Sequence, residues 1–245
     1  ESAALPYRRL GVVRTADAAD GWYERDVRGV ELRSVSTHFG VETARVEVLL
    51  GPLLALECPR LQIQPLMEQA WTRLQTLRER LVDVRVAASV PAIAKAMERA
   101  EDALRTPCAT TLTTVEEQLA GAFDACNSAS THNKEAANVR ALQALAAAAS
   151  FDFSQAIVRS EQAAALSESF AQRWQHRVLH AELLLDQGRE FNDVESLKTL
   201  QKLCEESLLP MVPADKMPAE RAWVYDCLGQ TLGILGRRQS FTATL

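Results

Sequence analysis

Two histidines four residues apart are the clearest candidate for chemistry in this sequence. His176 and His180 stand at positions i and i+4 of a segment with helical periodicity, so both imidazoles would lie on one helix face and could bind one zinc ion. Zinc helices of the common catalytic type have Glu directly after the first His, where this chain has Arg177. No third ligand is identifiable, although Glu182 and Asp186 are near in the sequence. We therefore predict no metal and no cofactor. A helical enzyme with a scattered site, metal-dependent through His176 and His180, is kept as an alternative function.

Other motifs typical of catalytic sites are absent from the sequence. The chain has no G-x-S-x-G nucleophile motif and no G-x-x-x-x-G-K or G-x-G-x-x-G phosphate-binding loop. The adjacent carboxylates Glu116–Glu117 and Glu205–Glu206 would point in different directions from a helix, because residues i and i+1 do not share a face. We therefore predict a protein that is not an enzyme and has no catalytic residues.

The composition favours closely packed helices. The chain has 245 residues, of which 47% are hydrophobic, with 38 alanines against 10 glycines and nine prolines. Alanine has the highest intrinsic helix propensity, and this length suits one large domain or two small ones. The net charge of −5 argues against extensive contact with nucleic acid. The apolar runs are far shorter than the roughly 20 residues of a transmembrane helix, so we predict no transmembrane segment.

The cysteines favour a reducing compartment inside the cell. Their number is odd, they are far apart, and no C-x-x-C motif occurs; they are Cys58, Cys108, Cys126, Cys204 and Cys227. This pattern does not suit a disulfide framework, so we expect the cytoplasm or the mitochondrial matrix. Because the first residue is Glu1 rather than Met, we expect a processed or trimmed product, which is compatible with an organelle.

Three regions follow one another along the chain. Residues 1–60 hold five of the ten glycines and no sustained helical period, so we expect an irregular N-terminal arm. Residues 61–129 form a helical segment, in which apolar residues recur at spacings of four and three, and Thr114 is a candidate helix N-cap with Glu117 in capping-box position. Residues 130–245 predict five further helices joined by short connections, near 134–149, 153–167, 170–187, 194–208 and 218–235.

A register recurs within the third region. Three small residues would lie inside helices where two backbones could approach closely, and seven residues after each of them we expect a turn. The small residues are Ala144, Ala181 and Gly229, and the expected turns are at Phe151, Gly188 and Gly236.

This register, together with Phe153–Ile157, Ala163 and Leu228–Gly229, resembles the tetratricopeptide repeat over residues 130–245. The intervals of 37 and 48 residues depart from the period of about 34 in that family. The resemblance implies a mainly α fold in which antiparallel helix hairpins stack as a short solenoid behind the irregular arm. An Ala-rich helical bundle is the alternative.

The resemblance also implies a binding surface. The first helix of each such repeat lines a concave groove that binds peptides or helices. Mapped onto this sequence, the candidate partner-binding residues are Gln175, Glu182, Asp186, Trp223, Asp226 and Gln230. This set is neutral to acidic with one Trp, so we expect a basic or amphipathic helix or peptide as the protein partner.

We therefore expect a non-catalytic adaptor, or an accessory or structural subunit of a larger assembly. The last predicted helix is rich in apolar side chains, and we expect the arm, another copy or neighbouring subunits to cover part of it. A subunit of a mitochondrial ribonucleoprotein or respiratory complex is a second alternative, beside the helical enzyme, although contact with nucleic acid is not favoured.

Overall fold

The computed structural model describes residues 12–13, 23–24, 60–105, 111–128 and 133–242. Apart from a two-residue antiparallel pair, β1 (Val12–Val13) with β2 (Tyr23–Glu24), these residues are predominantly helical, which confirms the mainly α fold. The rest of the predicted arm, residues 1–60, lies outside the described residues except for Arg60. The chain divides into two compact units, Glu1–Asp152 and Phe153–Leu245.

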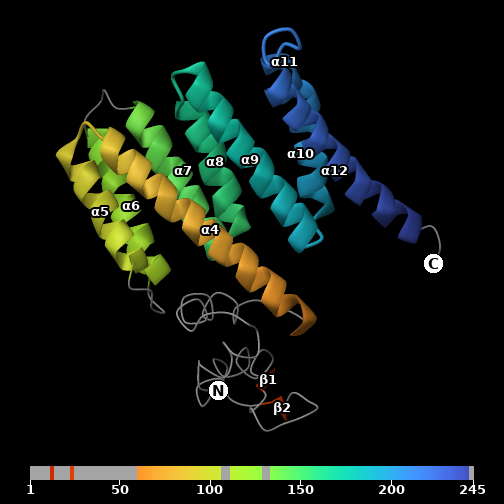
Figure 1. Ribbon diagram of the computed structural model, residues 1–245, viewed down its shortest axis with the longest axis horizontal. Coiled ribbons are helices and arrows are strands. Elements are labelled where there is room, and N and C mark those ends of the chain that lie inside the picture. Colours follow the sequence, from red (N-terminus) through yellow and green to blue (C-terminus); the bar gives the residue numbers. More distant parts are fainter. Residues whose placement is uncertain (1–11, 14–22, 25–59, 106–110, 129–132, 243–245) are drawn as a thin grey trace. The chain divides into compact units, whose positions relative to one another are not determined.

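Unit 1 holds α4 (Arg60–Ala87), α5 (Pro91–Arg105), α6 (Thr111–Ser128) and α7 (Asn133–Ala149) (Figure 1). α4 and α6 each pack against both α5 and α7, so the four helices surround one core, as in a four-helix bundle. The core takes the apolar face of every helix, including Leu77, Leu81, Ile93, Met97, Val115, Leu119, Val139 and Leu142. The region predicted as repeats, 130–245, thus begins with a helix of unit 1.

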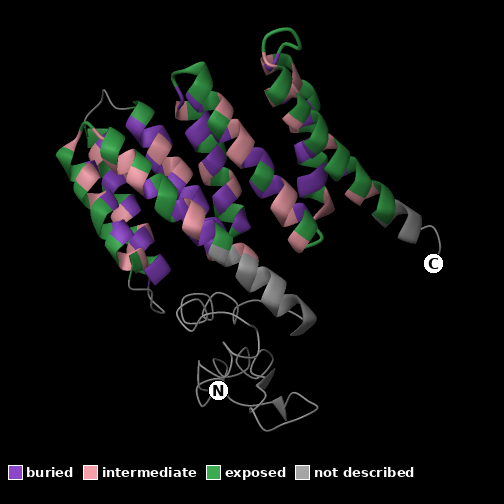
Figure 2. Ribbon diagram, in the orientation of Figure 1, coloured by how far each residue is buried: buried purple, intermediate pink, exposed green. Residues whose placement is uncertain are grey.

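The predicted start of α6 was wrong by one turn. α6 begins at Thr111 rather than after Thr114. The additional turn buries Thr111 and Leu112, and the contacts of these side chains outweigh the local capping signal. α5 begins at Pro91, and buried and exposed residues alternate along α5 and α6 with a helical period (Figure 2).

Unit 2 is a series of antiparallel helix hairpins. It holds α8 (Phe153–Leu166), α9 (Phe170–Glu190), α10 (Val194–Leu203) and α12 (Pro218–Thr242). α10 continues into one π-helical turn, η2 (Cys204–Leu208), and the short α11 (Leu209–Met211). Each helix packs against the next: α8 on α9, α9 on α10, and α10 with η2 on α12, which also touches α9. This sequential packing is compatible with a helical repeat.

Local signals explain the short turns of unit 2. Asp193 is the N-cap of α10: its Oδ1 accepts hydrogen bonds from the backbone N–H groups of Glu195 and Ser196 at 3.0 and 3.3 Å. Its Oδ2 accepts from Gln187 Nε2 of α9 at 2.9 Å, so one carboxylate joins the end of α9 to the start of α10. Asn192, directly before it, has a φ of 61°, a left-handed conformation that Asn tolerates.

Two of the three predicted turns were wrong. Phe151 lies in a turn with a φ of 61°, but Gly188 and Gly236 lie inside α9 and α12. The turn after α9 is made instead by Asn192. Gly188 meets a different need: a Cβ atom there would overlap the side chain of Leu197 on α10, so glycine allows the two helices to approach closely.

Candidate functional site

All six predicted partner-binding residues lie on α9 and α12, which contact each other within unit 2. Gln175, Glu182, Asp226 and Gln230 are exposed, and Asp186 and Trp223 are half-buried. We call these six residues the α9–α12 surface. They form a set because the two helices that carry them contact each other.

An aromatic pair joins the two helices at one end of the α9–α12 surface. The ring of Trp174 meets that of Trp223 edge-to-face, with centroids 6.0 Å apart and an interplanar angle of 81°. Both indoles are half-buried against the hydrophobic core of unit 2. Trp174 was not among the predicted binding residues. Its position directly before Gln175, a residue of the expected groove, was the signal that could have found it.

α9 and α12 each carry a carboxylate that influences the buried thiol of Cys227. The pKa of the buried Cys227 thiol is raised first by its hydrogen bond with Cys204 and by burial, and further by the negative charges of Glu182 and Asp226. Glu182 belongs to α9 and Asp226 to α12, so both carboxylates lie around the same core thiol. The charged members of the α9–α12 surface, Glu182, Asp186 and Asp226, are all carboxylates.

Several polar groups at or near this surface form ion pairs or hydrogen bonds with neighbouring residues. Asp186 forms an ion pair with Arg189 at 2.8 Å, and Asp226 Oδ2 accepts a hydrogen bond from Gln230 Nε2 at 2.8 Å. The guanidinium of Arg221, near the start of α12, donates to the carbonyl of Val212 at 3.0 Å and to the hydroxyl of Tyr225 at 3.0 Å. The α9–α12 surface thus combines an aromatic pair with carboxylates, and both kinds of group can bind a cationic side chain.

The two histidines form a pair of serine–histidine contacts between α8 and α9. Ser167 Oγ lies 2.8 Å from His176 Nδ1, and Ser160 Oγ lies 2.9 Å from His180 Nδ1. Ser160 lies on α8 and Ser167 directly follows its last residue, while the two histidines stand four residues apart on α9. All four side chains are buried. Neither serine was among the predicted site residues.

The direction of these hydrogen bonds follows from the acceptors around them. Each serine hydroxyl donates to a backbone carbonyl at 2.8 Å, Ser160 to Ile157 and Ser167 to Ala163. His176 Nδ1 also lies 3.2 Å from the Ala163 carbonyl, which can only accept, so Nδ1 carries the proton and donates. A serine nucleophile needs a neighbouring base that accepts its proton. His176 Nδ1 cannot accept that proton while it donates to the Ala163 carbonyl, and the two pairs link α9 to α8 and to the residue that follows α8.

Within the described parts of the chain, no group of three or more His, Cys, Asp or Glu side chains is placed to hold a metal ion. Burial lowers the pKa of His180, an effect that Arg177 strengthens and Glu161 and the Ile157 carbonyl oppose. His180 is therefore held as the neutral imidazole. Among the described helices, none combines the length and the apolar character needed to cross a membrane.

Comparisons with protein-family models, with curated proteins and with solved structures gave no match to this chain.

Proposed function

We propose that this protein is a non-catalytic interaction subunit that binds a basic or amphipathic helix or peptide through the α9–α12 surface. The observation that carries the proposal is the Trp174–Trp223 pair, which joins α9 to α12, the two helices that also carry the exposed carboxylates of Glu182 and Asp226. In this reading unit 2 is tetratricopeptide-like, with α9 and α10 as one hairpin and α12 as the first helix of the next. The protein would act as an adaptor or accessory subunit in a reducing compartment, the cytoplasm or the mitochondrial matrix.

The aromatic pair gives the surface a rigid apolar part. Indole rings offer a large contact area at a small cost in side-chain entropy, and they attract cations at their faces. Because the two rings also pack on the core of unit 2, they are fixed before a partner arrives. Fixed contact groups lower the entropic cost of binding.

The carboxylates provide the charge selectivity. A lysine or arginine side chain that reaches Glu182 and Asp226 exchanges its solvation for a charge-assisted contact, whereas an acidic peptide is repelled. The interaction should weaken as salt is added, because exposed charges are screened over about 10 Å at 0.1 M ionic strength.

The test is binding of two helical probe peptides of equal apolar content, one rich in Lys and the other with Glu in the same positions. Isothermal titration calorimetry on the full chain should show binding of the Lys peptide alone. The double variant Glu182→Lys/Asp226→Lys should weaken that binding about tenfold or more. The control, Glu117→Lys/Asp124→Lys on α6, makes the same charge change on two exposed residues of unit 1 and should leave binding unchanged. Equal binding of both peptides, or none of either, would overturn the proposal.

A further inference from the structure

Two cysteines from different elements meet in the core of unit 2. Cys204 is the first residue of η2 and Cys227 lies in the middle of α12, and the two elements pack against each other. Cys204 is fully buried and Cys227 is 3% exposed. Both belong to the same hydrophobic cluster, together with Leu200, Leu208 and Val224. The proposed binding function uses neither thiol.

The two thiols lie close enough within this cluster to interact. They share a hydrogen bond that lowers the pKa of Cys204 and raises that of Cys227, as expected when the Cys227 S–H donates to the Cys204 sulfur. The residues are 23 positions apart in the sequence and stand on two separate elements. A bond between them would join these elements covalently.

Cys126 shows how an ordinary core thiol differs. It is buried in unit 1, and its pKa is raised to about 11 by burial and by the charge of Glu135, with no second thiol contributing. Single buried cysteines of this kind behave as small apolar residues. The contact between two thiols, not burial, sets Cys204 and Cys227 apart.

We propose that Cys204 and Cys227 are a redox-sensitive pair that closes to an intramolecular disulfide on exposure to a peroxide, tying η2 to α12. The Cys204 sulfur attacks one oxygen of hydrogen peroxide, the O–O bond breaks, and a sulfenic acid and one water form. The Cys227 sulfur then attacks the Cys204 sulfur, the S–O bond breaks, and the second water leaves with the Cys227 proton. The two thiols are oxidised by two electrons and the peroxide is reduced to two waters. A dithiol reductant reverses the change.

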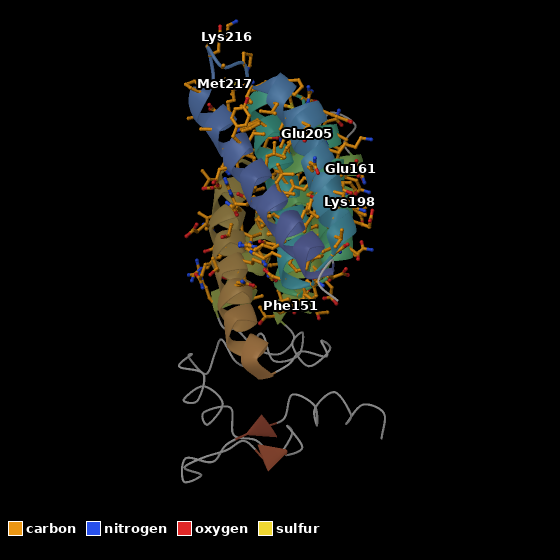
Figure 3. The ribbon with its side chains drawn as sticks, turned by 90° about the vertical axis from the view of Figure 1, so that its right-hand side faces the viewer. Phe151, Glu161, Lys198, Glu205, Lys216 and Met217 are labelled. Carbon is orange, nitrogen blue, oxygen red and sulfur yellow. The ribbon has the colours of Figure 1, made fainter. Side chains whose placement is uncertain are left out.

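The disulfide would act directly beneath the α9–α12 surface. Cys227 is the neighbour of Asp226 in sequence, and α12 also carries Trp223. Figure 3 shows α12 running beside α10, with Lys216 and Met217 in the segment that leads into it. The exposed Glu205 follows Cys204 on η2. The closed loop would enclose that turn, so oxidation is expected to raise the midpoint of thermal unfolding.

The experiment uses the full chain with Cys58, Cys108 and Cys126 replaced by Ala, which leaves the proposed pair as the only thiols. The reduced protein is exposed to hydrogen peroxide at low protein concentration, then denatured, alkylated and examined by intact mass and peptide mapping. We expect a monomer that has lost two hydrogen atoms, takes up no alkylating agent and yields a peptide joining residues 204 and 227. Its Tm should rise and fall back on addition of dithiothreitol.

Single replacements in the same background, Cys204→Ala or Cys227→Ala, should leave one alkylatable thiol and no rise in Tm. Peptide mapping of the unmodified chain gives a second reading if the triple variant fails to fold, as judged by circular dichroism. The proposal is overturned if both thiols of the folded protein stay alkylatable after peroxide, or if the products are only separate sulfinic acids or disulfide-linked dimers. Peptide binding by the α9–α12 surface is a separate measurement, so either proposal can fail alone.

Discussion

Gly188 of α9 lies directly beneath Leu197 of α10, with no room for a Cβ atom between the helix backbone and the leucine side chain. Gly229 on α12 is different, because nothing lies within 4 Å of the place where its Cβ would be. Both glycines are inside helices, so replacement by Ala brings the same gain in helix propensity. The effect of each replacement on stability therefore depends on the atoms around the new Cβ.

We therefore expect Gly188→Ala to destabilise the protein by about 1–3 kcal/mol, because the overlap with Leu197 outweighs the gain in propensity. Gly229→Ala should be neutral or stabilising by up to about 1 kcal/mol. Urea unfolding followed by circular dichroism measures both. Equal effects of the two replacements would contradict this, because they would show that a Cβ atom at residue 188 fits between α9 and α10.

The buried imidazole of His180 predicts a pH dependence of stability. Burial lowers the pKa of His180 below its ordinary 6.5, so the unfolded chain binds a proton more readily than the folded one. The contribution of the neutral imidazole is complete above pH 6.5 and is lost as the pH falls below that value. The free energy of unfolding should decline by up to about 1.4 kcal/mol per pH unit in that range.

His180→Gln is the variant that checks this, because it keeps a polar side chain without titrating near pH 6. Urea unfolding at pH 7.5 and 5.5 should show a smaller decline for the variant than for the unchanged protein. An identical decline in both would assign the acid sensitivity to other groups.

Glu101 of α5 predicts a second, larger effect in unit 1. This carboxylate is buried and accepts a hydrogen bond from Arg105 at 2.6 Å, while Arg85 of α4 lies 3.4 Å from its other oxygen. Glu101→Ala leaves Arg85 without this partner and should cost about 2–4 kcal/mol. Asp102→Ala is the matched control: Asp102 also pairs with Arg105, at 3.2 Å, but is exposed, so its loss should cost less than about 1 kcal/mol. A cost for Asp102→Ala as large as for Glu101→Ala would contradict this.

The helices of this protein could be predicted from the sequence because apolar periodicity is a local property. The predicted helices 134–149 and 153–167 correspond to Asn133–Ala149 and Phe153–Leu166. Helix ends were less predictable: α9 was expected to end at residue 187, yet it continues to Glu190, since Gly188 is needed for packing and not for a turn. In a sequence, a glycine that forms a turn cannot be distinguished from a glycine that lets two helices approach closely.

Contacts between residues far apart in the chain could not be predicted from the sequence. Glu135 of α7 accepts hydrogen bonds from the backbone N–H and the hydroxyl of Ser89, at 2.6 and 2.7 Å, across 46 residues of chain. Nothing in the spacing of these residues indicates the pair. The same holds for Cys204 and Cys227, since their contact depends on how α12 packs against η2. The predicted register assigned the six residues of the α9–α12 surface to two helices that do contact each other, but their binding role stays a prediction, and nothing in the sequence ranked Trp174 above its neighbours.

Because Trp223 packs against Trp174, we expect a replacement of Trp223 to change the stability of the protein as well as its binding. Its ring packs on Trp174 and on the core of unit 2, so Trp223→Ala should lower the free energy of unfolding by about 1–3 kcal/mol as well as weaken any partner. In a double-mutant cycle with Trp174→Ala, the coupling between the two rings should be about 0.5–1.5 kcal/mol. Additive effects would show that the edge-to-face contact contributes nothing. Asp226→Lys changes an exposed side chain and should leave stability within about 0.5 kcal/mol, so binding lost in that variant reports on the surface itself.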